Sequence, residues 1–138
     1  GQVALDQGMD RSFYKIAMRP GKPLMAGKLG QMTVVGLPGN PVSSILCGMI
    51  FICPMIRKLQ GLGDCTHVTE SIPLAGEIPS NSPRQHYMRA IAENGAVSVF
   101  ERQDSALLSV LAQANALVIR PPNAKAAKAG ELVDIIRL

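Results

Sequence analysis

Five basic residues precede a loop that is rich in glycine and proline. The basic residues are Arg11, Lys15, Arg19, Lys22 and Lys28, and the loop is Gly36-Leu37-Pro38-Gly39-Asn40-Pro41. Arg and Lys side chains bind phosphates and other oxyanions, Arg as a planar fork and Lys as a point charge. The two glycines permit sharp turns and a close approach of a ligand to the backbone, whereas the two prolines stiffen the path. The combination predicts a site for a small anion.

The loop leads into the start of a helix, which can add backbone donors. Asn40 is a favoured N-cap and Pro41 a favoured first helical residue, so we expect free N–H groups at Val42, Ser43 and Ser44. A strand that feeds a helix through such a loop is a common phosphate site in α/β proteins. The alternative is a strand-to-helix turn with no ligand, since the loop has neither P-loop nor dinucleotide spacing.

The positive charge is concentrated in the first half of the chain. Residues 1–62 hold seven Lys and Arg against two Asp, a net charge of +5, whereas residues 63–138 hold seven against eight acids, a net charge of −1. Only 4% of the residues are aromatic, which leaves little surface for base stacking. A small phosphorylated ligand therefore fits the pattern better than a nucleic acid, and a solvated basic face is the alternative.

Cysteine and histidine usage gives no metal site. Cys47, Cys53 and Cys65 form an odd set without a Cys-x-x-Cys pair, and we expect reduced core residues. His67 and His86 are isolated in the sequence, and each is expected to be a half-exposed side chain on a strand.

The longest apolar run covers residues 45–56 and contains Pro54. It is shorter than the roughly 20 residues that a membrane-spanning helix needs. The N-terminus has no signal-peptide pattern, so we expect a cytoplasmic protein that does not contact a membrane.

Periodicity and turn residues predict an α/β segment followed by an all-β domain. In the first part we expect strands at 12–18, 24–26 and 31–35, and a helix over 41–59 that is kinked or broken at Pro54. Glycines at 27 and 30 are expected to join the second and third strands as a hairpin. The basic residues and the loop would then lie around the start of this helix.

Beyond Gly63 the pattern changes to short strands separated by turn residues. The expected strands cover 66–74, 85–93, 96–102, 116–120 and 132–137, with a short helix at 105–114. Closure into a small barrel or packed roll would leave no open edges. We therefore predict a partial α/β domain over residues 1–62 and a small β-barrel domain over residues 63–138.

Two segments carry a resemblance to a known family. They are Lys15-Ile16-Ala17-Met18-Arg19-Pro20-Gly21-Lys22-Pro23 and Gly36-Leu37-Pro38-Gly39-Asn40-Pro41-Val42-Ser43. These segments resemble the molybdopterin molybdenumtransferases of molybdenum cofactor biosynthesis and their eukaryotic relative gephyrin. The similarity continues in Asp104-Ser105-Ala106-Leu107-Leu108 and Gly130-Glu131-Leu132-Val133, so it covers almost the whole chain.

The resemblance implies a reaction in which molybdate is inserted into adenylylated molybdopterin and AMP is released, with Mg²⁺ as cofactor. It implies cationic catalytic positions at Lys15, Arg19 and Lys22. The substrate-binding positions that it implies are Gly36, Pro38, Gly39, Asn40, Pro41, Ser43 and Ser105, with Ser109 as the alternative to Ser105.

The family's upstream glycine-rich segment and its Mg²⁺-handling acids have no counterpart in this sequence. We therefore assign no metal ligands, and expect an α/β domain truncated at its N-terminus and a fragment that is inactive alone. The family's dimers imply a homodimer. The alternative function is a scaffolding or binding module that uses the C-terminal β domain.

Overall fold

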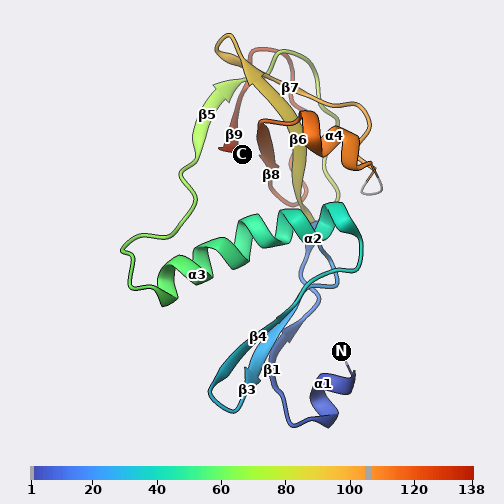
Figure 1. Ribbon diagram of the computed structural model, residues 1–138. Helices are drawn as coiled ribbons and strands as arrows, with labels where there is room; N and C mark the ends of the chain where they lie inside the picture. The colour runs from blue at the N-terminus through green and yellow to red at the C-terminus, as the bar shows by residue number, and fades with distance from the viewer. Residues whose placement is uncertain (1, 105–106) are drawn as a thin grey trace.

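The structure is a computed structural model that describes residues 2–104 and 107–138 of the chain. Figure 1 shows a larger β-sheet region, a long helical segment across the middle, and a smaller sheet on the opposite side of that segment. The helical segment thus separates the two sheets, and the chain passes between them in both directions.

The smaller sheet is antiparallel in the order β1-β3-β4, with β1 at Asp10–Tyr14, β3 at Met25–Leu29 and β4 at Met32–Gly36. A short helix, α1 (Gln2–Asp6), precedes it. The hairpin turns at Gly30, whose φ of 59° suits glycine. The expected strand over 12–18 is divided, because β1 ends at Tyr14 and β2 (Met18–Arg19) joins the other sheet.

The helical segment comprises α2 (Pro41–Cys47), a π-helix η1 (Gly48–Ile52) and α3 (Cys53–Leu59). Pro54 has no N–H to give to the carbonyl of Ile50, and the turn widens there so that the Cys53 N–H donates to the Gly48 carbonyl. The Nε2 atom of His67 lies 3.3 Å from the Ile50 oxygen. The predicted kink is therefore a π-helical turn, and His67 lies in a loop rather than on a strand.

By length and composition, the segment Pro41–Leu59 could cross a membrane, and core helices of soluble proteins have the same length and composition. Val42, Leu46, Cys47 and Ile50 pack into a core cluster with residues of the larger sheet. One face of the segment therefore belongs to the protein core.

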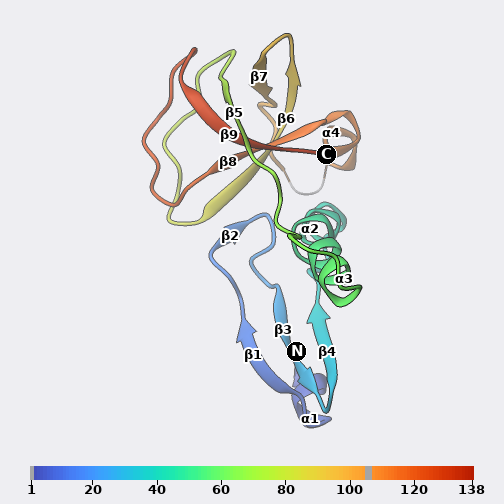
Figure 2. The ribbon, with the colours of Figure 1, turned by 90° about the vertical axis from the view of Figure 1, so that its left-hand side faces the viewer.

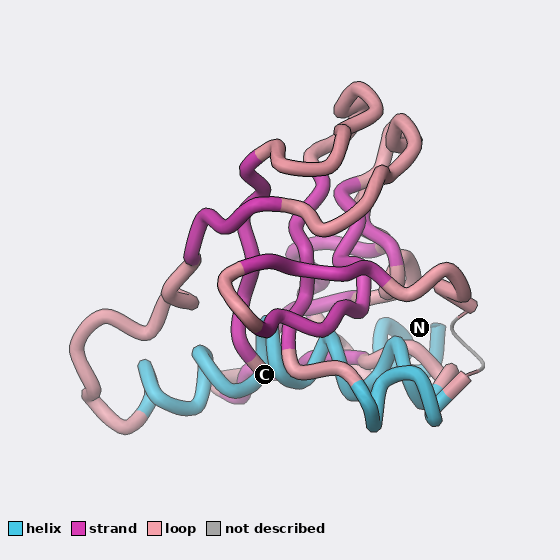
Figure 3. Tube along the Cα trace, turned by 90° about the horizontal axis from the view of Figure 1, so that it is seen from above, coloured by secondary structure: helices cyan, strands magenta, loops and turns pink. Residues whose placement is uncertain are grey.

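The larger sheet has the order β2-β6-β8-β9-β5, and β7 also pairs with β6. Its further strands are β5 (Glu70–Pro73), β6 (Gln85–Glu93), β7 (Ala96–Val99), β8 (Ala116–Arg120) and β9 (Leu132–Arg137), and α4 covers Leu108–Gln113. Figure 2 shows β2 at the junction of the two sheet regions, and Figure 3 shows the helices gathered along one side of the strands. Three of the five strands expected beyond Gly63 match β6, β8 and β9, whereas the strands expected over 66–74 and 96–102 are shortened to β5 and β7.

The expected closed barrel is wrong, because this sheet is rolled but open. Strands β2 and β7 share one edge of β6. Strand β2 pairs with Gln85 and His86, and β7 pairs with residues 90–93. Within the described residues, the ends of the roll are joined only by an isolated bridge between Leu74 and Val97. Strand β5 has four residues and pairs with β9 alone, so it cannot complete a ladder to β7.

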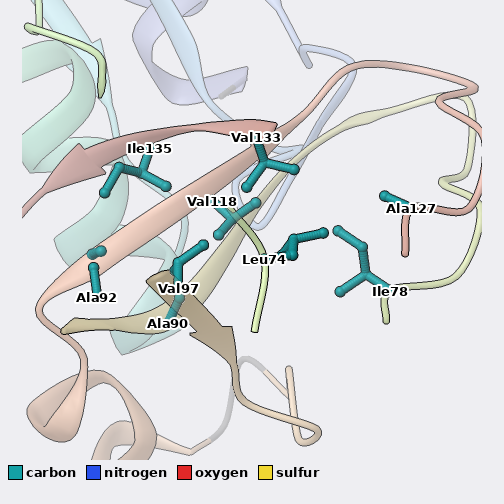
Figure 4. Close-up of a cluster of buried hydrophobic side chains, with 10 residues drawn as sticks. Leu74, Ile78, Ala90, Ala92, Val97, Val118, Ala127, Val133 and Ile135 are labelled. Carbon is teal, nitrogen blue, oxygen red and sulfur yellow. The ribbon is translucent and has the colours of Figure 1, made fainter. Parts of the chain in front are cut away.

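Two apolar clusters form the core. The first lies inside the rolled sheet and includes Val97, Val118, Val133 and Ile135, which point toward one another in Figure 4. The second joins the helical segment to the sheet, and its members are Met18, Leu24, Val42, Leu46, Cys47, Ile50, Tyr87, Leu117 and Ile136. This second cluster spans the domain boundary expected at residue 62, so the parts on either side of it share a core.

The three cysteines are free, and Cys47 is buried in the second cluster as expected. Burial raises the pKa of the Cys47 thiol to about 11, which keeps it protonated at neutral pH. Cys53 is exposed and Cys65 is half-buried, so the expectation of a core position is wrong for these two.

Candidate anion-binding site

A cavity of about 880 Å³ lies between the turn that follows β2 and the larger sheet. The turn contributes residues 20–23, the β5–β6 loop contributes residues 77–82 and Arg84, and strands β6 and β8 contribute His86, Met88 and Arg120. Ser43 of α2, residues 99–101, Gln103 and Asp104 complete the lining. The cavity thus draws on both halves of the chain.

The turn after β2 is held in place by close backbone packing. Gly21 has a φ of 118°, and a Cβ added there would lie 2.7 Å from the Cys47 sulfur. The Lys22 carbonyl accepts the Ile16 N–H at 3.1 Å, and the Gly21 carbonyl accepts the Leu24 N–H at 3.0 Å. Glycine at position 21 therefore lets the turn rest against α2, and this placement brings Arg19 and Lys22 to the cavity.

Three basic side chains lie side by side across three neighbouring strands. Arg19 of β2 is the register partner of His86 of β6, and His86 is the register partner of Arg120 of β8. Register partners point to the same face of a sheet, and all three residues line the cavity. We call these residues the cross-strand row.

The environment of His86 keeps its imidazole neutral. Burial lowers the pKa of His86 to about 4, and the charges of Arg19, Arg89 and Arg84 act in the same direction. Only 7% of His86 is exposed, so the sequence-based expectation of a half-exposed side chain is wrong. At neutral pH this imidazole can donate one hydrogen bond and accept another.

Arg120 is also 7% exposed. Its guanidinium donates to the Lys125 carbonyl, and its Nε is buried with no hydrogen-bond partner among the described residues. Burial lowers the pKa of Arg120, while Glu131 acts in the opposite direction. Arg120 makes no ion pair with a carboxylate among the described residues, where the pair found is Arg137 with Glu70. Burying a guanidinium that has no carboxylate in contact and one N–H unpaired costs stability.

Arg89 supports the cavity from the other face of β6. It is 1% exposed, and it donates to the Gln103 side-chain oxygen and to the Asp104 carbonyl, the latter at 2.9 Å. Gln103 in turn donates to the Arg89 carbonyl at 2.9 Å and to the Phe100 carbonyl. These bonds fix the segment after β7, and Gln103 and Asp104 of that segment line the cavity.

Carboxylates on the cavity rim do not form a metal site. Glu77, Glu101 and Asp104 are exposed and line the cavity. Among the described residues, no group of three His, Cys, Asp or Glu side chains could hold a metal ion. The described residues therefore do not fit the Mg²⁺ that the resemblance implies, and no step is derived through it.

The structure brings together three of the residues singled out in the sequence. Arg19, Lys22 and Ser43 all line the cavity. Lys15 lies elsewhere, with its Nζ 5.0 Å from the centre of the Tyr14 ring. Ser105 lies outside the described residues, and Ser109 is exposed on α4. The roles proposed for these side chains stay predictions.

The glycine-proline loop is a separate feature, since none of its residues from Gly36 to Pro41 lines this cavity. Gly36 instead accommodates Met25, whose side chain would lie 2.7 Å from an added Cβ. The Asn40 side chain caps the Ser43 N–H at 3.2 Å, as its N-cap position predicts. The Ser44 N–H is taken by the Asn40 carbonyl, so the expectation of free donors is wrong for both serines.

The sequence reasoning missed His86, Arg89 and Arg120 as members of the site. All three lie on strands that were predicted correctly, at 85–93 and 116–120. A signal was present, because basic residues interrupt segments that are otherwise apolar. Their common position emerges only from the register between strands that are distant in sequence.

Residues 71–138 match the family model of the MoeA C-terminal region (domain IV). The chain belongs to the MoeA family. It is 33% identical over 132 residues to molybdopterin molybdenumtransferase 2 of Mycobacterium tuberculosis. This match covers 94% of the chain and 32% of the relative. A shorter stretch of 50 residues, 36% of the chain and 12% of the relative, is 50% identical to the Haemophilus influenzae molybdopterin molybdenumtransferase.

Solved MoeA-family structures have a similar fold. A molybdenum cofactor biosynthesis protein from Pyrococcus furiosus superimposes with a TM-score of 0.80 at 25% identity, over 94% of this chain and 46% of that chain. The molybdopterin biosynthesis MoeA protein of Pyrococcus horikoshii superimposes with a TM-score of 0.77 at 26% identity. This superposition covers 94% of this chain and 33% of that chain. The chain spans about a third of the length of the curated relatives that it matches.

Proposed function

We propose that this MoeA-family chain contributes an oxyanion-binding region to an enzyme that inserts molybdate into adenylylated molybdopterin. The observation that carries the proposal is the cavity in which Arg19, Lys22 and Ser43 meet. Cationic side chains on a structured turn stabilise an oxyanion and the charge that develops on it during transfer. Relatives named molybdopterin molybdenumtransferase support this reaction class.

In this proposal Lys22 and Arg19 bind the oxyanion, and the Ser43 hydroxyl orients it. Arg19 can form a bidentate contact, whereas Lys22 supplies a point charge from the turn. Ser43 is buried, and its hydroxyl donates to the Asn40 side-chain oxygen at 3.4 Å, so this long bond is exchanged for one to the anion when the anion binds. The chain binds and positions the anion, and groups beyond this chain complete the reaction.

Further parts of the proposal rest on the family resemblance. We expect the complete enzyme to use Mg²⁺ held by residues upstream of this chain, to work in the cytoplasm and to be a homodimer. Residues 1–138 alone are then inactive in transfer. The chain's 32% coverage of its relatives agrees with the need for a further region.

The test is calorimetry with tungstate and adenylylated molybdopterin on the chain and on a version extended to the length of the relatives. Lys22→Gln is expected to weaken tungstate binding about tenfold, since it removes a charge-assisted contact. Lys58→Gln on α3 removes the same charge outside the cavity and serves as the matched control. Absence of binding to the extended protein, or equal affinities of the two variants, would contradict the proposal.

A further inference from the structure

The cavity is much larger than the oxyanion that the proposed function places at the turn. Its volume is about 880 Å³. One water molecule takes up about 30 Å³, and a tetrahedral oxyanion is only a few times larger. Clefts of about 300 to 1,000 Å³ hold ligands of the size of a cofactor. The strand side of the cavity, where His86 and Arg120 lie, is therefore free for a further part of a ligand.

The strand side is an open end of the rolled sheet. His86, Met88 and Ala90 share one face of β6, because alternate residues of a strand point the same way. For the same reason Arg120 shares a face of β8 with Val118. Ala90 and Val118 belong to the first apolar cluster, inside the roll (Figure 4). His86 and Arg120 therefore point into the interior of the roll, next to its core.

The floor of the strand side is apolar. Ile78 is buried in the first apolar cluster, and Met88 and Val99 are half-buried against it. All three side chains line the cavity. An oxyanion on such a surface would lose hydration without gaining a donor, whereas the face of a flat ring fits it. The floor therefore favours an uncharged ring over a second anion.

Two buried polar side chains stand beside this floor, and they are neighbours in the register of β6 with β8. The Nε of Arg120 is buried and has no hydrogen-bond partner among the described residues. His86 is neutral at pH 7, because burial lowers its pKa to about 4, so one ring nitrogen can accept a hydrogen bond. The pair suits a ring edge that has acceptors for the guanidinium and an N–H for the imidazole.

We infer that the strand side binds the oxo-pyrimidine edge of a fused nitrogen heterocycle, of the pterin or guanine type, through Arg120 and His86. Such rings carry a carbonyl oxygen and a ring nitrogen side by side, the pair that arginine binds in guanine, and a ring N–H next to the carbonyl. Adenine carries an amino group in place of that oxygen, so it would turn a donor toward Arg120, which is itself a donor.

The inference rests on the proposed function for the identity of the natural ligand. Adenylylated molybdopterin contains both kinds of ring, a pterin and an adenine. The pterin then enters the strand side, with its face on Met88 and Val99, while Arg19 and Lys22 hold the oxyanion on the turn side.

The experiment titrates the 138-residue chain with 6-hydroxymethylpterin, a ring without a phosphate, and follows the fluorescence of the pterin. The chain has no tryptophan, so its own emission is weak. Saturable binding is expected, with guanosine as a competitor and adenosine at least about tenfold weaker. Absence of pterin binding up to about 1 mM, or equal competition by the two nucleosides, overturns the inference.

Arg120→Gln is expected to weaken pterin binding about tenfold. It should also narrow the preference for guanosine over adenosine, because a glutamine amide pairs with adenine as arginine pairs with guanine. Arg57→Gln on α3 removes the same charge away from the cavity and should leave pterin binding within about twofold. Wild-type pterin affinity in Arg120→Gln that is folded by circular dichroism overturns the inference. If this variant does not fold, the comparison of the two nucleosides on the wild type decides the matter.

Calorimetry with tungstate on the same chain separates this inference from the proposed function. Absence of tungstate binding, with normal pterin binding, would count against the oxyanion role of the turn side alone. Absence of pterin binding, with normal tungstate binding, would count against the ring position on the strand side alone.

Discussion

The two sides of the cavity are built in different ways. On the turn side, Arg19 and Lys22 are exposed cations at the ends of a short segment held by Gly21 and a few backbone bonds. On the strand side, His86, Arg89 and Arg120 are buried within long β ladders. Exposed cations keep their hydration and cost little stability, whereas buried basic groups must be compensated by hydrogen bonds or a ligand. Changes to the strand side should therefore act first on folding, and changes to the turn side first on binding.

The largest expected effect is that of Arg89→Met on the strand side. It removes the donors to Gln103 and to the Asp104 carbonyl, and should lower the free energy of unfolding by about 3 kcal/mol. Urea unfolding with an unchanged m value would measure it. Arg102→Met, an exposed neighbour, is the control and should change stability by less than about 0.5 kcal/mol. Equal stabilities of the two variants would remove the contrast between the two sides.

A pH effect of His86 comes next. Its folded pKa of about 4 lies below the unfolded value of 6.5, so the unfolded chain binds more protons between these values. The contribution of His86 is fully present above pH 6.5 and is lost as the pH falls toward 4, at a cost of about 2 to 3 kcal/mol. Urea unfolding at pH 7, 5.5 and 4.5 should show this loss in the wild type. The loss should be smaller in His86→Gln and unchanged in the control His67→Gln.

Gly21→Ala is expected to have an intermediate effect on stability and a clear effect on binding. The new Cβ would lie 2.7 Å from the Cys47 sulfur at a φ of 118°, which should cost about 2 kcal/mol. The turn would move, and with it Arg19 and Lys22, so tungstate affinity should fall by more than the loss of folded protein explains. Gly39→Ala, whose Cβ would meet no atom within 4 Å, is the matched control. Unchanged tungstate affinity in folded Gly21→Ala would show that the turn does not position the cations.

The smallest effect is expected at the N-cap of α2. Asn40→Ala should lower stability by about 1 kcal/mol, while Asn40→Ser should retain most of the cap. Tungstate affinity should stay nearly constant, because Asn40 does not line the cavity. A large loss of affinity in folded Asn40→Ala would instead identify the glycine-proline loop as a ligand site.

The parts of the fold that depend on neighbouring residues could be predicted from the sequence. Gly30 marks the β3–β4 turn, Asn40 and Pro41 mark the start of α2, and a mostly apolar run over residues 87–92 before Asn94-Gly95 marks β6. Parallel pairing of Met18–Arg19 with β6 could not be predicted, because two residues carry no periodicity and the pairing bridges 67 residues of chain. The π-helical turn was partly signalled by Pro54, but the role of His67 beside it was not.

The candidate site was predicted on one side only. Arg19, Lys22 and Ser43 belong to continuous motifs, and the sequence shows them directly. His86 and Arg120 become neighbours through the register of β6 with β8, which a one-residue shift would abolish. Local sequence therefore indicated the turn side, and the strand side required the tertiary structure.

The pairing of β2 with β6 has a consequence for any attempt to produce the C-terminal region by itself. The family match begins at residue 71, whereas β2 lies upstream of it. Strand β2 contains Arg19 and pairs with Gln85 and His86 of β6. A protein cut at residue 71 would keep Arg120 and lose Lys22, and it would expose an unpaired stretch of β-strand. Such an edge can recruit a strand from another molecule, so the shortened protein would be prone to aggregation as well as weak in anion binding.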